Sequence, residues 1–192
     1  MDYDALAHEL TVWLREQAQN AGLEGFAVGL SGGVDSAVSA ALAVRAVGPE
    51  HVWAAWLPCH SLEEDAAYAR MTADALGLRL VTVDLGPAFD ALLAALPPGS
   101  DIARANIKPR LRMTALYYLA QSHHALVLGT GNKPEITVGY FTKYGDGGVD
   151  LEPLGELYKR DVRALARVLG IPEPVITRAP TAGLWAGQTD EG

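Results

Sequence analysis

The sequence predicts an α/β domain in which helices cover both faces of a parallel sheet. Four short apolar runs have the length of buried strands, and segments with helical spacing of apolar residues alternate with them. The runs cover residues 25–30, 52–57, 79–85 and 125–128. Nearly continuous apolar strands are typical of parallel sheets, because helices bury both of their faces. We find no internal repeat or linker, so we expect a single domain over residues 1–192.

The helical segments are expected at residues 4–19, 37–47, 61–76, 87–96, 106–121 and 160–169. Ser61 and Glu64 have the spacing of a capping box, so Ser61 is expected to cap the third of these helices. Pro109 falls in the first turn of the fifth, where proline is tolerated. Residues 129–156 are rich in glycine and show little periodicity, which predicts a long functional loop.

Charge and composition exclude several classes of protein. The net charge of -8 argues against a general nucleic-acid binder, and no apolar run is long enough to span a bilayer. Cys59 is the single cysteine, so a reducing cytoplasm is the simplest setting. Residues 101–167 hold 10 Lys and Arg against 7 Asp and Glu, whereas residues 1–100 hold 4 against 13. The cation-rich stretch is either a solvated helical face or a site for a polyanion such as a nucleotide.

A loop of the type that binds phosphate follows the first predicted strand. It reads Ser31-Gly-Gly-Val-Asp-Ser36, and the helix behind it directs its free N–H groups toward the same point. It matches neither a Walker A loop nor a dinucleotide-binding Gly-x-Gly-x-x-Gly fingerprint. Asp35 would repel a phosphate unless a cation lay between them, so it is either a Mg²⁺ ligand or a cap of the helix.

These residues resemble known enzymes at two levels. The Ser31–Ser36 hexapeptide resembles the pyrophosphate loop of the N-type ATP pyrophosphatases, which have the adenine-nucleotide alpha-hydrolase-like fold. A second cluster resembles one member family, the ammonia-dependent NAD synthetases, and similarity to that family covers nearly the whole chain. The cluster consists of Leu128-Gly-Thr-Gly-Asn-Lys-Pro-Glu135, Gly139 to Asp150 and Leu154 to Lys159, with Asn106 to Met113 upstream and Ala179 to Trp185 downstream.

The resemblance implies a role for each matching residue. ATP phosphates would be bound by Gly29, Leu30, Ser31, Gly32, Gly33, Val34, Asp35 and Ser36, with further ATP contacts at Thr130, Lys159 and Thr181. Mg²⁺ would be held by Asp35 and Glu135, which with Lys159 would form the catalytic set. Arg110, Lys143 and Asp150 would contact deamido-NAD. The alternatives are ordinary surface charges for the basic residues, a loop-stabilising role for Asp150 and a helix cap for Thr181.

The implied reaction has two steps. The nicotinate carboxylate of deamido-NAD attacks the α-phosphorus of ATP and releases pyrophosphate, and ammonia then displaces AMP to give NAD. One domain uses up the length, so we expect no glutaminase domain, free ammonia as the nitrogen donor and, as in the family, a homodimer. The rival hypotheses are another amide-forming or tRNA-modifying ATP pyrophosphatase and a nucleotide-binding module without catalysis.

The sequence departs from the family at two places. Pro109 stands where members usually have a small helix former, next to Arg110. Members also continue past the Ala179–Trp185 motif into a C-terminal segment whose His-Lys pair contacts substrate. This sequence ends at Gly192, so we expect that segment to be missing.

Overall fold

The computed structural model describes residues 1–178. Their four strands form one sheet in the order β3-β2-β1-β4, and each neighbouring pair is parallel. The strands are β1 (Gly25–Gly29), β2 (Val52–Trp56), β3 (Leu80–Thr82) and β4 (Ala125–Leu128). The predicted parallel sheet is confirmed. Strand β3 is shorter than expected because it is the edge strand and its side chains are partly exposed.

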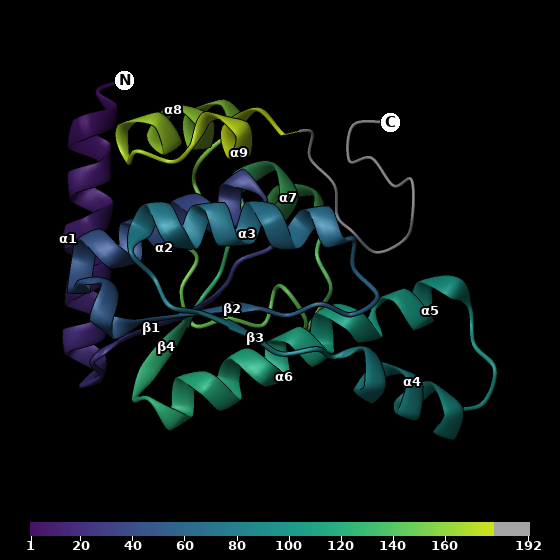
Figure 1. Ribbon diagram of the computed structural model, residues 1–192. Helices are drawn as coiled ribbons and strands as arrows, with labels where there is room; N and C mark the ends of the chain where they lie inside the picture. Colours follow the sequence, from purple (N-terminus) through teal and green to yellow (C-terminus); the bar gives the residue numbers. More distant parts are fainter. Residues whose placement is uncertain (179–192) are drawn as a thin grey trace.

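Helices cover both faces of the sheet, as predicted (Figure 1). They are α1 (Tyr3–Ala21), α2 (Val34–Val47), α3 (Glu63–Leu76), α4 (Gly86–Ala95), α5 (Asp101–Ala105), α6 (Ile107–Ser122), α7 (Lys133–Val138), α8 (Lys159–Val168) and α9 (Glu173–Thr177), with a 3-10 turn η1 (Pro49–His51). Helix α2 packs on one face, with α1 and α8 outside it, and α6 packs on the other. Within residues 1–178, no helix is long and apolar enough to cross a bilayer.

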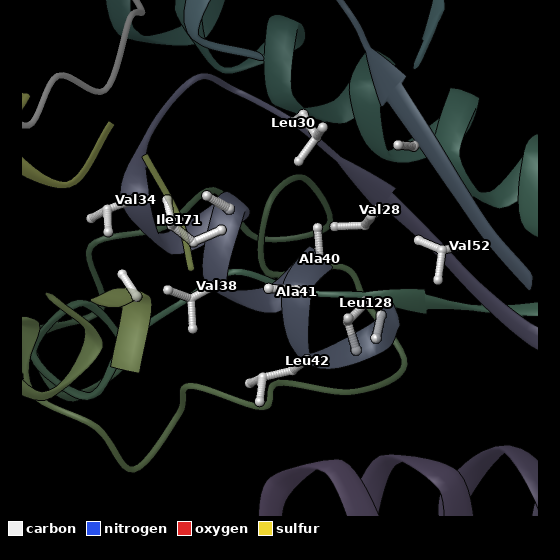
Figure 2. Close-up of a cluster of buried hydrophobic side chains, with 14 of the residues drawn as sticks. Val28, Leu30, Val34, Val38, Ala40, Ala41, Leu42, Val52, Leu128 and Ile171 are labelled. Atoms are coloured by element: carbon white, nitrogen blue, oxygen red, sulfur yellow. The ribbon is translucent and has the colours of Figure 1, made fainter. Parts of the chain in front are cut away.

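The main core lies between α2 and the sheet (Figure 2). Val28 of β1 and Leu128 of β4 belong to the same buried cluster as Val38 and Leu42 of α2. Full burial of a side chain of this size contributes about 2 kcal/mol. Most of α2 is buried, which explains why its sequence is apolar on nearly every side. The packing holds the start of α2 firmly against the carboxyl end of β1.

The start of α3 differs from the sequence prediction. Leu62 is the N-cap residue and makes no side-chain capping bond, so the predicted capping box at Ser61 is wrong. The Ser61 hydroxyl instead accepts hydrogen bonds from the Cys59 N–H and from Arg112, both at 3.2 Å. Competition by these partners draws the hydroxyl away from the free amides of the helix.

Three short helices were not predicted from the periodicity. Helices α5, α7 and α9 have five or six residues each, too few to display a helical repeat of apolar positions. Helix α7 interrupts the glycine-rich segment that the sequence suggested was a loop. It begins at a capping box, in which the Asn132 side chain accepts from the Glu135 N–H and the Glu135 side chain accepts from the Asn132 N–H.

The strand order brings two loops together. Strand β1 pairs with β2 on one side and with β4 on the other. The chain proceeds from β1 to β2 and β3 on one side of β1, and then crosses to the other side to form β4. Ligands of open parallel sheets bind beyond the carboxyl ends of the strands at such a switch point. The segments after β1 and β4, which carry Asp35 and Glu135, therefore reach the same place.

Candidate active site

A cavity of about 560 Å³ lies beyond the carboxyl ends of the strands. Its walls come from the segments that follow β1, β2 and β4, from α6 and from the start of α8. Of the residues expected to bind ATP or metal, Gly29, Leu30, Ser31, Gly33, Val34, Asp35, Thr130, Glu135 and Lys159 line it. Thr181, also expected to contact ATP, lies outside the described residues.

The loop between β1 and α2 is closed by its own hydroxyl groups. The buried Ser36 hydroxyl donates to the Gly33 carbonyl at 2.9 Å and accepts from the Ser31 N–H at 3.2 Å. The Ser31 hydroxyl accepts from the Gly33 N–H at 3.2 Å. Ser36 therefore shapes the loop from behind, and Ser31, which is exposed, faces the cavity.

Only glycine fits at position 32, at the bend of this loop. Its φ of +84° is a conformation that L side chains rarely adopt. A Cβ atom there would lie 2.7 Å from the Asp65 carbonyl oxygen and 2.9 Å from an Arg178 nitrogen. The guanidinium of Arg178 donates to the Gly32 carbonyl at 3.3 Å, pairs with the Asp65 carboxylate and stacks on Tyr68. This cluster fixes the back of the loop.

Asp35 does not cap α2. The N-cap is Gly33, without a side-chain capping bond, and Asp35 instead points to groups from distant parts of the chain. Its Oδ1 accepts from the Asn132 side-chain amide at 3.2 Å, and its Oδ2 accepts from the Lys159 ammonium group. Asn132 is 2% exposed and also forms the capping box with Glu135. Asn132 therefore links the two carboxylates that the resemblance assigns to Mg²⁺.

Glu135 has an environment that disfavours its charged form. Burial raises the pKa of its carboxyl above the ordinary value, and the charge of Asp35 adds to the rise. The backbone N–H of Asn132 and the ammonium of Lys159 lower the pKa in part. A cation placed between Asp35 and Glu135 would remove the repulsion between them.

The residues fit a phosphate-bound Mg²⁺ ion and not an all-protein metal cage. Among residues 1–178, no group of three or more His, Cys, Asp or Glu is placed to hold a metal ion. Mg²⁺ is commonly held by one or two carboxylates together with substrate phosphates, while water fills its other positions. Asp35 and Glu135 supply two carboxylates in the wall of one cavity, beside the start of α2, whose first N–H groups have no partner within the helix.

The residues expected to contact deamido-NAD lie elsewhere. Within the described part of the chain, Arg110, Lys143 and Asp150 do not line the cavity. Arg110 and Lys143 are exposed and adjacent, since the Arg110 Nε donates to the Lys143 carbonyl at 3.2 Å. Asp150 accepts from the Tyr117 hydroxyl at 2.9 Å and from the Val127 N–H at 2.7 Å, so it also stabilises the edge of β4.

Glu152 packs against the segment after β4 and accepts a hydrogen bond from it. One of its carboxylate oxygens accepts from the Gly131 N–H at 3.0 Å. A Cβ atom on Gly129 would lie only 2.4 Å from this carboxylate, which explains the glycine. Burial, together with the charges of Asp146 and Glu135, raises the pKa of Glu152 to about 7, although the hydrogen bond from the Gly131 N–H opposes the rise.

Four site residues were not assigned from the sequence. Asn132 and Glu152 organise the β4 loop, while Arg112 and Arg178 line the cavity. The Asn-x-x-Glu spacing of a capping box was the available signal for Asn132. The contacts of the other three are long-range, so no local pattern marks them.

Comparisons with known proteins point to one family. The model of a family described as NAD synthase matches residues 6–192. The chain is 50% identical to the NH(3)-dependent NAD(+) synthetase of Carboxydothermus hydrogenoformans, covering 100% of this chain and 81% of that protein. Among solved structures, NMN synthetase from Francisella tularensis has a TM-score of 0.95 at 39% identity, covering 100% of this chain and 80% of that one.

A second solved structure gives the same result. The NH3-dependent NAD synthetase from Campylobacter jejuni, in complex with the nitrate ion, has a TM-score of 0.87 at 32% identity, covering 92% of this chain and 77% of that chain. The family match and the similarity of fold agree. The chain belongs to the NAD synthase family.

Proposed function

We propose that this chain is a ligase that uses ATP and ammonia to convert deamido-NAD to NAD, with AMP and pyrophosphate as the other products. The observation that carries the proposal is the convergence of Asp35, Glu135 and Lys159 beside a glycine loop in one cavity. Curated relatives described as NH(3)-dependent NAD(+) synthetases support this choice of substrates.

The chain's residues suit the first step by binding and neutralising charge. The N–H groups in the first turn of α2, directly behind the Ser31–Ser36 bend, bind phosphate oxygens. Asp35 and Glu135 would hold Mg²⁺ against those oxygens, and the ion would withdraw charge from the leaving pyrophosphate. Lys159 stands beside Asp35, where its ammonium group neutralises charge that develops as the α–β phosphate bond breaks.

The second step needs few groups from the protein. Ammonia attacks the acyl carbon of the adenylate, the carbon–oxygen bond to AMP breaks, and the nitrogen loses a proton. Adenylation supplies the good leaving group, so the enzyme contributes mainly by holding the reactants together and excluding water. We propose that deamido-NAD also contacts three residues that do not line the cavity, Arg110, Lys143 and Asp150.

A turnover assay tests the proposal. The purified chain is incubated with Mg-ATP, deamido-NAD and ammonium, while AMP, pyrophosphate and NAD are followed together. We expect equal amounts of all three products, and no NAD when ammonium is omitted. ATP binding without pyrophosphate release would contradict the ligase proposal and favour the nucleotide-binding module.

A mononucleotide acceptor is the second candidate. The solved structure from Francisella tularensis is described as an NMN synthetase and covers the whole of this chain. The same assay with nicotinate mononucleotide in place of deamido-NAD compares the two. A higher kcat/KM for the mononucleotide would show that the chain amidates nicotinate mononucleotide in preference to deamido-NAD.

We also propose a homodimer that works in the cytoplasm. Family resemblance supports the dimer, and so do exposed apolar side chains near α7, where Val138 is 76% and Tyr144 is 67% exposed. Apolar surface of this kind is common at interfaces between proteins. Both nucleotide substrates are intracellular metabolites. Sedimentation at micromolar concentration should give twice the mass of the chain, and a monomer there would contradict the dimer.

A further inference from the structure

Arg112 is a half-buried cation in the wall of the cavity. It lies on α6, and its Nε donates to the Leu57 carbonyl at 3.0 Å while Nη2 donates to the Ser61 hydroxyl at 3.2 Å. Both acceptors are neutral. Within residues 1–178, Arg112 forms no ion pair, and no hydrogen bond is formed by its third nitrogen, Nη1.

The other cations of the cavity already have carboxylate partners. Lys159 is paired with Asp35, and Arg178 is paired with Asp65. Burial lowers the pKa of Arg112, and attraction to Cys59, Asp65 and Asp146, none of which forms a hydrogen bond or ion pair with it in the described residues, opposes the shift. An arginine stays charged in proteins, and a partly desolvated charge is costly unless an anion compensates for it. Within the part of the chain that the structure describes, Arg112 is thus a positive charge in the cavity wall without a paired carboxylate.

The position of this charge complements that of Lys159. Leu57 and Ser61 follow β2, whereas Asn132, which holds Asp35 beside Lys159, follows β4. Strands β2 and β4 lie on opposite sides of β1 and its phosphate loop. Arg112 and Lys159 therefore belong to opposite sides of the loop, and both line the same cavity as the loop.

We propose that Arg112 binds a phosphate group of a nucleotide substrate in this cavity. The proposal rests on the function proposed above, because that function brings two phosphate-bearing molecules to the site. The phosphate belongs to ATP, at the α-position between adenosine and the pyrophosphate, or to the acceptor nucleotide. In both cases Arg112 is a direct ligand-binding residue, and its bonds to Leu57 and Ser61 hold the guanidinium in place.

Pairs of ligands that differ by one phosphate test the proposal. Dissociation constants for AMP and adenosine, and for nicotinate mononucleotide and nicotinate riboside, are measured on the wild type and on R112Q and R112K by NMR titration. For R112Q we expect the phosphate-bearing ligand of one pair to bind about tenfold to a hundredfold more weakly, with its phosphate-free analogue within about twofold. The affected pair identifies the source of the phosphate.

Two control variants separate binding from positioning and from net charge. S61A removes an acceptor of Arg112 and keeps the cation, so it should retain the preference for phosphate. R167Q removes a guanidinium that is paired with Glu173 on the surface, and it should leave all four affinities unchanged. If R112Q does not fold, R112K answers the same question, because a lysine loses the planar fork and should bind the phosphate less tightly than arginine.

Other outcomes would overturn the proposal. Equal weakening of both members of a pair would make Arg112 a positioning residue for the segment after β2, and unchanged affinities would give it no role in binding. Turnover of the wild type is measured in parallel. NAD formation with an unaltered phosphate preference in the Arg112 variants overturns this proposal alone, whereas a wild type that binds no phosphate-bearing ligand overturns the proposed function with it.

Discussion

Lys159 donates a hydrogen bond to Asp35 in the wall of the cavity, although 124 positions separate the two residues in the chain. Their side chains are 26% and 17% exposed, so the pair is partly shielded from water. The pairing keeps an ammonium group beside the carboxylate that we propose as a Mg²⁺ ligand. It also predicts that the two residues act as a unit.

Asp35→Asn should lose most of the pyrophosphate release. The change removes a charge with little change of size, and we expect kcat to fall by at least about 100-fold. The Mg²⁺ concentration for half-maximal activity should rise by at least about tenfold. D74N, an exposed change on α3, is the matched control. Fully additive losses in D35N, K159Q and the double variant would show that the two residues act independently.

Gly32→Ala should destabilise the protein more than Gly33→Ala. Alanine at Gly32 must adopt a φ of +84° and contact the Asp65 backbone, which costs at least about 1 kcal/mol. At Gly33 φ is -92°, and a Cβ atom would lie 3.3 Å from the Ser31 hydroxyl. Urea denaturation of both variants measures the difference, and equal midpoints would contradict the strain assigned to Gly32.

Glu152 should make the protein less stable as pH rises from about 4.5 to about 7. Its folded-state pKa of about 7 lies above the ordinary value of 4.5, so the folded protein binds more protons in this window. The stabilisation that this carboxyl group contributes is fully present below pH 4.5, and it is lost as the pH rises through the folded-state pKa of about 7.

The variant E152Q provides the test for this pH effect. Glutamine keeps an acceptor for the Gly131 N–H and removes the titration. Melting temperatures of wild type and E152Q are compared at pH 5 and pH 8. The difference in favour of E152Q should grow with pH, and a constant difference would show that Glu152 does not titrate in this range.

Asp150→Ala should reduce both the stability of the protein and its binding of deamido-NAD. It leaves the Val127 N–H of β4 without its carboxylate partner, at a cost of about 1–3 kcal/mol. Tyr117→Phe removes only the 2.9 Å bond to Asp150 and should cost about 1 kcal/mol or less. Thermal melts and the KM for deamido-NAD are measured on both variants. A raised KM in D150A at unchanged stability would assign Asp150 to substrate alone.

The local sequence determined the main elements and the chemistry of the first loop. Apolar runs predicted all four strands, and three of them, β1, β2 and β4, are mostly buried, as expected for parallel strands with helices on both faces. The Ser31–Ser36 hexapeptide indicated phosphate binding because glycines and free helix amides are local features. The same pattern marked Asp35 as a residue that needs a cation nearby.

Tertiary structure alone decided how these pieces meet. The order β3-β2-β1-β4 depends on packing between segments far apart in the chain, and it places Asn132 and Lys159 beside Asp35. Ser61 shows the same effect in reverse, because a bond from Arg112 replaced the local cap that its spacing predicted. Side-chain partners of buried charges are chosen by three-dimensional proximity, so the pairing of Lys159 and the unpaired state of Arg112 in the described residues followed only from the fold.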